Sequence, residues 1–200
     1  MLFATIAVLG AYFIGSVSSA ILVCRLWGVD DPREVGSGNP GATNVMRHAG
    51  KLAALLTLVG DAAKGFIPVL IGRGFGLEIE IVACVGLAAF LGHLFPIFFA
   101  FKGGKGVATF IGVNLALAWW LGLSFIVIWL AMAASFRYSS LAALTASMAL
   151  PFIAFYTALP LGVVVCLVAM VILVFVRHRS NIEKLCAGEE KRIGATKAAP

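Results

Sequence analysis

The chain has 200 residues, of which 62% are hydrophobic and only 12% are charged, and its formal net charge is +6. A soluble domain needs far more polar surface, so this composition excludes one and indicates an integral membrane protein. In such a protein a positive balance reports lysine and arginine in cytoplasmic loops more readily than nucleic-acid binding, so no nucleic-acid partner is expected.

Apolar runs follow one another along the chain, and most are long enough for a single crossing of ~20 residues. They occupy residues 2–24, 52–72, 79–101, 107–135, 139–157 and 160–176. No basic residue precedes the first run, whereas Arg25 follows it. This order of charge predicts a retained first helix with its N-terminus outside, and not a cleaved signal peptide.

The run at residues 107–135 decides the topology. Basic residues are frequent in segments 25–51 and 102–106 and in a tail that contains Arg177, Arg179, Lys184, Lys191, Arg192 and Lys197. These three regions share the cytoplasmic face only if the run contains two helices. One helix would be about 43 Å long, whereas a break near Ala118–Gly122 gives two short helices with Trp119 and Trp120 at the far interface.

We therefore predict an all-α integral membrane protein that forms one domain over residues 1–200. It has seven transmembrane helices, an outside N-terminus and a cytoplasmic C-terminus, and its site-forming segments are residues 25–51, 92–109 and 177–190. A single tilted helix over the run at 107–135 is the alternative.

The polar segment Gly36-Ser-Gly-Asn-Pro-Gly-Ala-Thr-Asn-Val-Met-Arg47 is the first candidate site. Asn39 is expected to cap a helix that begins at Pro40, and the exposed amides of a helix start beside Arg47 suit a phosphate. The pattern G-x-G-x-x-G is present without a preceding strand, and Ala42 stands where a P-loop has lysine, so neither nucleotide site is predicted. A plain interhelical loop would not need this set of groups: Ser37, Gly38, Asn39, Gly41, Thr43, Asn44 and Arg47.

The second candidate surrounds Lys105, which Gly103, Gly104 and Gly106 flank at the start of a helix. Exposed amides, a helix N-terminus and a cation again suit phosphate, whereas a basic turn at the membrane interface would not need the glycines. His93 and Ser140 lie near the predicted cytoplasmic ends of their helices and are secondary candidates.

The third candidate follows the last span, where Arg177-His-Arg is by itself an ordinary basic flank. If the helix continues, His178 and Asn181 share a face and present a donor and an acceptor. Asp61 and Lys64 are also three residues apart, at membrane depth, and an ion pair that stabilises helix packing is the favoured interpretation over direct chemistry.

Four cysteines are scattered along the chain, with no pair at C-x-x-C spacing. We interpret them as small apolar fillers at membrane depth, so no disulfide, metal site or cofactor is predicted.

These three clusters in this order resemble the acyl-phosphate-dependent glycerol-3-phosphate acyltransferases of bacteria, the PlsY family. The motifs are Gly36 to Arg47, Gly92-His-x-x-Pro96 with Phe101-x-Gly-Gly-Lys-Gly-Val-Ala-Thr109, and His178-x-x-Asn181. The resemblance implies a seven-helix enzyme of the bacterial inner membrane that transfers an acyl chain from acyl-phosphate to the 1-hydroxyl of glycerol 3-phosphate, giving lysophosphatidate. It also implies membrane lipid around the chain, an upstream enzyme that supplies acyl-phosphate, and a site lined by Ser37, Thr43, Arg47, Lys105, His178 and Asn181.

The chemistry of the residues agrees, because an acyl phosphate is already activated and the protein needs chiefly to position the hydroxyl and neutralise two phosphates. His178 could donate to phosphate or accept the hydroxyl proton, and the sequence leaves both roles open. A transporter of a small phosphorylated solute is the alternative function, although few polar groups lie on the outer side. A purely structural membrane subunit would leave the glycine-cation loops without a purpose.

Overall fold

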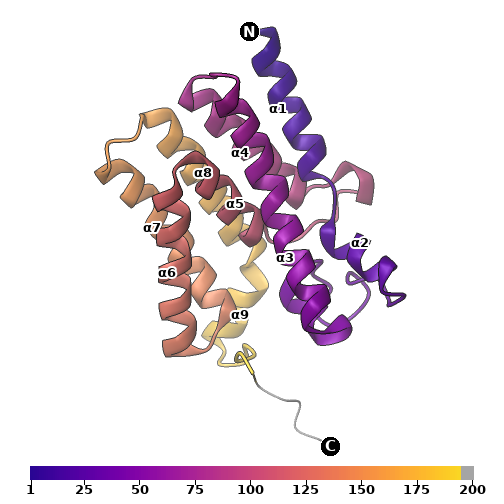
Figure 1. The fold of residues 1–200 in the computed structure, drawn as a ribbon. Coiled ribbons are helices and arrows are strands. Elements are labelled where there is room, and N and C mark those ends of the chain that lie inside the picture. The colour runs from indigo at the N-terminus through magenta and orange to yellow at the C-terminus, as the bar shows by residue number, and fades with distance from the viewer. Residues whose placement is uncertain (195–200) are drawn as a thin grey trace, which may run out of the picture.

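The computed structural model describes residues 1–194, and every regular element in that range is a helix. Figure 1 shows these helices gathered into one bundle, with α9 at the opposite end from the start of α1. The elements are α1 (Leu2–Gly15), α2 (Ser19–Leu26), α3 (Ala42–Gly74), α4 (Ile79–Leu94), the 3-10 turn η1 (Ile97–Phe99), α5 (Val107–Leu117), α6 (Trp119–Phe136), α7 (Ser139–Tyr156), α8 (Leu161–Arg177) and α9 (Arg179–Cys186).

Much of this bundle is long and apolar enough to cross a membrane. Five segments meet that requirement in the described part of the chain: Leu2–Leu26, Ala42–Gly74, Ile79–Phe99, Trp119–Phe136 and Ser139–Tyr156. Helices α8 and α9 qualify only as a pair bent by 60°, and α5 is a shorter apolar helix. The all-α membrane fold is confirmed, whereas the count of seven crossings and the orientation of the termini stay predictions. Lys197 of the basic tail lies outside the described residues.

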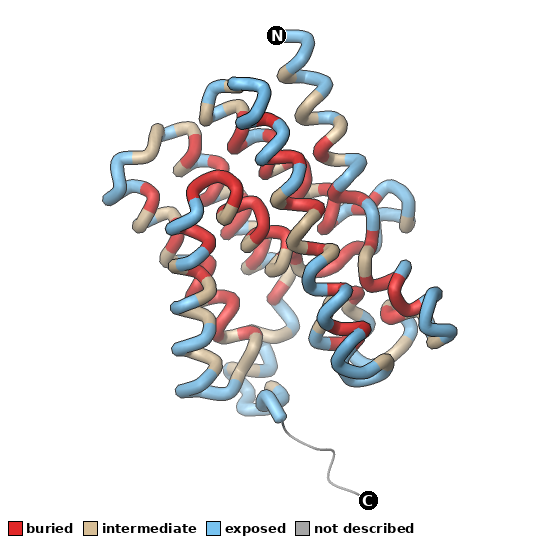
Figure 2. The backbone as a smooth tube through the Cα atoms, viewed as in Figure 1, coloured by how far each residue is buried: buried red, intermediate tan, exposed pale blue. Residues whose placement is uncertain are grey.

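The core of the bundle lies where α4, α5, α6, α7 and α8 face one another, and Figure 2 shows buried positions concentrated along these facing sides. Three aromatic rings form its centre: Phe110 packs edge-on against Phe90 and Phe125, with ring centroids 6.1 Å and 5.7 Å away. Such tilted arrangements are the favourable ones for aromatic rings. This packing fixes the ends of the helices that carry the polar segments.

The predicted break after α5 is confirmed. Ala118 adopts an extended conformation (φ −156°, ψ 113°), and α6 begins at the next residue. The guanidinium of Arg73 donates to the carbonyl of Ala116 over 2.8 Å, so it satisfies a carbonyl that the end of α5 leaves unpaired. The run at 107–135 is therefore two helices because its break has both an extended residue and a capping cation.

The first apolar run, predicted as one helix, is instead broken at residues 16–18. Ser18 caps α2, because its hydroxyl accepts a hydrogen bond from the amide of Ile21 over 3.5 Å. The carbonyl of Val17 accepts from the ammonium of Lys64 over 2.7 Å. Hydropathy alone did not reveal this break, because the residues on both sides of it are apolar.

The start of α3 also differs from the prediction. The amide of Gly41 donates to the carbonyl of Asn39 over 2.9 Å, so Pro40 lies in a tight three-residue turn and not in the first turn of a helix. Helix α3 begins at Ala42, preceded by Gly41 in an extended conformation, and the prediction that Asn39 is the N-cap was wrong. The helix then kinks at Gly50, where φ is 86°.

Candidate active site

The three polar segments meet at one end of the bundle. We call residues 27–41 the Ser37 loop, residues 102–106 the glycine loop and residues 177–190 the C-terminal segment. The ammonium of Lys105 in the glycine loop donates to the side-chain carbonyl of Asn181. The guanidinium of Arg177 donates to the carbonyls of Gly104 over 3.0 Å and Gly103 over 2.5 Å. The glycine loop and the C-terminal segment are therefore joined by direct contacts.

Asn44 shapes the Ser37 loop from the first turn of α3. Its side-chain carbonyl accepts from the amide of Ser37 over 3.1 Å, and its amino group donates to the carbonyls of Pro32 and Val35. Gly36 has a φ of 63°, and a Cβ there would overlap the Asn44 side chain. Asn44 is buried, and its amide groups are used within the loop, so its geometry is that of a loop-forming residue and not of the predicted substrate contact.

A second pair of side chains in the Ser37 loop was not anticipated. The guanidinium of Arg33 lies 2.7 Å from the carboxylate of Asp31 and also donates to the carbonyl of Phe99 over 3.3 Å. The hydrogen bond from Arg33 holds the pKa of Asp31 below its usual range. Arg33 thus links the Ser37 loop to the turn before the glycine loop, and its spacing of two residues from Asp31 was the signal available in the sequence.

Three of the predicted contacts remain accessible on the Ser37 loop and the start of α3: Ser37, Thr43 and Arg47 are all exposed. Within residues 1–194 their side chains make no hydrogen bond to the rest of the protein. Gly38 has a φ of 68° beside them, and Asn39 and Gly41 are half-buried. The hydroxyls and the guanidinium are therefore available to a ligand.

Lys105 is half-buried between cations. Burial lowers the pKa of its ammonium, the nearby Lys184, Arg177 and Arg47 lower it further, and Glu190 opposes the shift. A concentration of like charge in a partly desolvated place is costly unless an anion occupies it. The electrostatics of this end of the bundle thus favour a polyanionic ligand.

His178 lies at the bend between α8 and α9 and is 3% exposed. Its Nδ1 lies 2.8 Å from the carbonyl of Val174, so Nδ1 carries the proton and donates. In the neutral ring Nε2 then carries a lone pair and can accept a proton. The helix does not continue straight through His178, because the chain turns by 60° here, so the condition for the shared face of His178 and Asn181 is not met. Asn181 still reaches the site through Lys105.

Glu190 is a site residue that the sequence analysis did not select. One oxygen of its carboxylate accepts from the hydroxyl of Ser140 over 2.6 Å and from the side-chain amino group of Asn181 over 2.7 Å. The second bond fixes which way the Asn181 amide faces, so its carbonyl is turned toward Lys105. Ser140, predicted as a phosphate contact, is buried and holds Glu190. Ser140 lies far from Asn181 and Glu190 in the sequence, so no local pattern predicts this network of hydrogen bonds.

Asp61, Lys64 and His93 lie buried behind the glycine loop. The ammonium of Lys64 is 2.9 Å from the carboxylate of Asp61, so the structure contains the ion pair anticipated from their spacing. These residues belong to the packing beneath the site.

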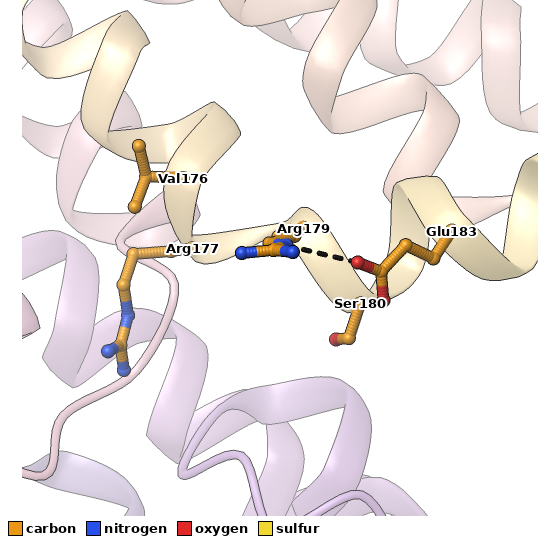
Figure 3. A pocket seen from close by; sticks show the side chains of 5 residues that line it. All are labelled: Val176, Arg177, Arg179, Ser180 and Glu183. Atoms are coloured by element: carbon orange, nitrogen blue, oxygen red, sulfur yellow. Dashed lines mark hydrogen bonds and ion pairs between the residues drawn. The ribbon is translucent and has the colours of Figure 1, made fainter.

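Beside the site is an open depression of about 340 Å³, lined by Val176, Arg177, Arg179, Ser180 and Glu183. Figure 3 shows Arg179 paired with Glu183, at 3.0 Å, while the side chain of Arg177 points away from that pair. Since the Arg177 guanidinium is bound to the glycine loop, this depression presents few uncommitted polar groups. The accessible groups of the three segments, and not this hollow, form the candidate site.

In residues 1–194 no three His, Cys, Asp or Glu side chains lie close enough to hold one metal ion. The groups that do converge are backbone amides, hydroxyls, an amide side chain and cations, which bind phosphate oxygens. The fold and the site together define a class: a polytopic helical membrane protein with a cation-rich polar site at one end of its bundle.

Comparison with known proteins is consistent with this class. The family model described as "Glycerol-3-phosphate acyltransferase" matches residues 5–188. The chain belongs to the glycerol-3-phosphate acyltransferase family. A relative of that name from Thioalkalivibrio sulfidiphilus is 53% identical over 194 residues, which cover 97% of this chain and 96% of the relative. Another, from Methylococcus capsulatus, is 53% identical over 188 residues, 92% of this chain and 93% of the relative.

Solved structures agree on the fold. The crystal structure of PlsY (YgiH), described as an integral membrane glycerol 3-phosphate acyltransferase in its glycerol 3-phosphate form, superposes with a TM-score of 0.91. It is 42% identical and covers 96% of each chain. The lysophosphatidic acid form of PlsY gives a TM-score of 0.89 at 41% identity, covering 96% of this chain and 95% of that one.

Proposed function

We propose that this chain transfers an acyl group from acyl-phosphate to the 1-hydroxyl of glycerol 3-phosphate, giving lysophosphatidate and inorganic phosphate for phospholipid synthesis. The hydroxyl oxygen forms an ester bond with the acyl carbon, and the bond from that carbon to the phosphate oxygen breaks. The electron pair leaves with the phosphate. Because an acyl phosphate is an activated anhydride, the step needs no covalent intermediate on the protein and no cofactor.

The protein's part in this step is to hold two phosphates close together. Lys105 and Arg47 neutralise their charge, and loop amides that make no hydrogen bond within the described residues, such as those of Asn39 and Lys105, donate to their oxygens. The hydroxyls of Ser37 and Thr43 and the amide of Asn181 orient the substrates by hydrogen bonding. These roles are supported by the exposure of Ser37, Thr43 and Arg47 and by the contact of Lys105 with Asn181.

The hydroxyl proton has two possible acceptors at this site, an oxygen of substrate phosphate and Nε2 of His178. The bond from Nδ1 to Val174 leaves Nε2 as the free position of the neutral ring. The variant His178→Gln distinguishes the two, because glutamine can donate to phosphate but cannot accept this proton. If that variant binds glycerol 3-phosphate but does not turn over, His178 is the acceptor of the hydroxyl proton.

The proposed site faces the cytoplasm of a bacterial inner membrane. The Ser37 loop, the glycine loop and the C-terminal segment meet at one end of the bundle, and the excess of lysine and arginine in these regions favours the cytoplasmic side. With α5 and α8 counted as crossings, the chain has seven spans and an outside N-terminus. Acyl-phosphate would reach the site from an upstream enzyme that phosphorylates acyl chains.

The contacts that join Lys105 to Asn181 and Arg177 to the glycine loop support this proposal most, because they bring distant polar segments into one place. The test gives purified protein in detergent labelled glycerol 3-phosphate with palmitoyl phosphate or with palmitoyl-CoA. We expect labelled lysophosphatidate with palmitoyl phosphate. Labelled product with palmitoyl-CoA, and none with palmitoyl phosphate, would refute acyl-phosphate as the acyl donor. Uptake of glycerol phosphate by sealed vesicles without product would favour a transporter.

A further inference from the structure

A cluster of buried polar side chains lies directly behind the glycine loop. Asp61 and Lys64 come from α3, and His93 comes from the last turn of α4. Each is at most 6% exposed. Ionisable groups are costly at such depth and persist only when their contacts compensate for the lost solvent.

Lys64 and Asp61 make contacts that connect several elements. The ammonium of Lys64 lies 2.9 Å from the Asp61 carboxylate and donates over 2.7 Å to the carbonyl of Val17, in the break between α1 and α2. The backbone carbonyl of Asp61 accepts from the hydroxyl of Thr109 over 2.9 Å. Thr109 is in the first turn of α5, immediately after the glycine loop. The Lys64 ammonium therefore holds the α1–α2 break against α3, and the backbone of Asp61 holds the start of α5 against α3.

His93 lies between this ion pair and the glycine loop. On one side its Nδ1 is 3.7 Å from the Asp61 carboxylate, and this buried nitrogen makes no hydrogen bond within the described residues. On the other side its backbone carbonyl accepts from the amide of Gly104 over 3.3 Å. A Cβ added to Gly104 would overlap the Nε2 edge of the His93 ring and come within 3.1 Å of the carbonyl of Pro40. The ring thus fills the space directly under Gly104.

We infer that His93 is a positioning residue that holds the glycine loop in its phosphate-binding conformation, with Asp61 facing its Nδ1 edge and Gly104 facing its Nε2 edge. The inference rests on the proposed function, because it assigns to this contact the binding of glycerol 3-phosphate. The ring and the carbonyl of His93 contact the backbone of Gly104, so the effect of His93 on the substrate passes through the loop. Removing the ring leaves a cavity under Gly104, and the loop amides lose their support.

The test compares His93→Gln, His93→Asn and His93→Ala in purified protein, with KM measured separately for glycerol 3-phosphate and palmitoyl phosphate. The longer amide side chain that His93→Gln introduces would reach toward Gly104, whereas the shorter side chains of the Asn and Ala variants leave that space empty. We expect KM for glycerol 3-phosphate to rise about tenfold in the Asn and Ala variants, as for loss of one buried contact, and less in the Gln variant. KM for palmitoyl phosphate and kcat stay within about threefold of wild type.

The matched control is Asn114→Ala, another buried polar residue, whose side chain donates over 2.8 Å to the carbonyl of Phe110 in its own helix. Within the described residues it makes no hydrogen bond to the glycine loop, so we expect both KM values to be unchanged. A second measurement, calorimetric titration of glycerol 3-phosphate into each purified variant, gives the dissociation constant without turnover. It should rise about tenfold in the His93→Asn protein.

Three results would overturn the inference: wild-type affinity for glycerol 3-phosphate in all His93 variants, an equal rise in both KM values, or the same change in the Asn114→Ala control. If an Ala variant does not fold, the comparison of Gln with Asn still decides the matter, because only their reach toward Gly104 differs. Wild-type protein that binds glycerol 3-phosphate but makes no lysophosphatidate would refute the proposed function while leaving the inference on loop positioning standing.

Discussion

Lys105 should carry the largest effect of any single cation at this site, and Lys105→Met tests that expectation. The substitution keeps an unbranched side chain of similar length and removes the ammonium that contacts Asn181. A hydrogen bond from a charged group contributes about 1.5–3 kcal/mol, which corresponds to a factor of roughly 10 to 150. A donor placed on charge that develops in the reaction contributes about 10²–10³-fold in rate.

Because Lys105 is half-buried next to the C-terminal segment, we expect the upper part of these ranges, a fall of at least about 100-fold in kcat/KM. The assay is formation of labelled lysophosphatidate from palmitoyl phosphate by purified protein. Lys102→Met is the matched control, because Lys102 is an exposed lysine in the same loop, and its loss should change kcat/KM by less than about threefold. Equal effects of the two substitutions would refute the assignment of Lys105 and reduce the loop to a general basic surface.

Other predictions concern the groups around Lys105. Since burial lowers the pKa of Lys105, its ammonium loses its charge at a lower pH than an ordinary lysine does. We therefore expect kcat/KM to fall as the pH rises through that lowered pKa, and we expect no such fall in the Lys105→Arg variant. Arg177→Gln removes the donors to the carbonyls of Gly103 and Gly104, so KM for glycerol 3-phosphate should rise about tenfold, and an unchanged KM would contradict this role. Glu190→Gln retains an oxygen that can accept from Ser140 and Asn181 and should keep more activity than Glu190→Ala; equal activity of the two would show that the hydrogen bonds do not matter.

The architecture could be predicted from the sequence where length and charge constrain it. The run at 107–135 was too long for one crossing and conflicted with the distribution of basic residues, and Ala118 indeed separates two helices. The spacing of Asp61 and Lys64 likewise identified an ion pair, because residues three apart share a helix face.

Other features depend on contacts that no local pattern records. The break at residues 16–18 is stabilised by Lys64, which lies far away in the chain. The tight turn at Pro40 replaces a helix start because the Asn39 carbonyl finds the amide of Gly41. The 60° bend at His178 places Asn181 on a separate helix, whereas the spacing argument for a shared face required one continuous helix.

Only some of the residues of the candidate site could be predicted from the sequence. Glycines, hydroxyls and cations gathered in polar segments indicated phosphate binding, and the structure brings Lys105, Asn181 and the glycine loop together. Glu190 and Arg177 lie in a segment that the sequence indicated, but they were not selected as site residues, because each acts through a partner distant in sequence and alone resembles an ordinary charge at a membrane interface. Asn44 and Ser140 were selected for the right region, but their side chains are used within the protein.

The central claim is that the three polar segments share the cytoplasmic face, where they form one site. The most direct measurement is labelling by a membrane-impermeant thiol reagent of single cysteines at Thr43, Lys102, Lys184 and Trp120, in a background without the four native cysteines. In sealed inside-out vesicles we predict that the first three are labelled and the cysteine at Trp120 is protected, with the reverse pattern in right-side-out vesicles. Labelling of the cysteines at Thr43 and Lys184 from opposite sides of the membrane would contradict a common site.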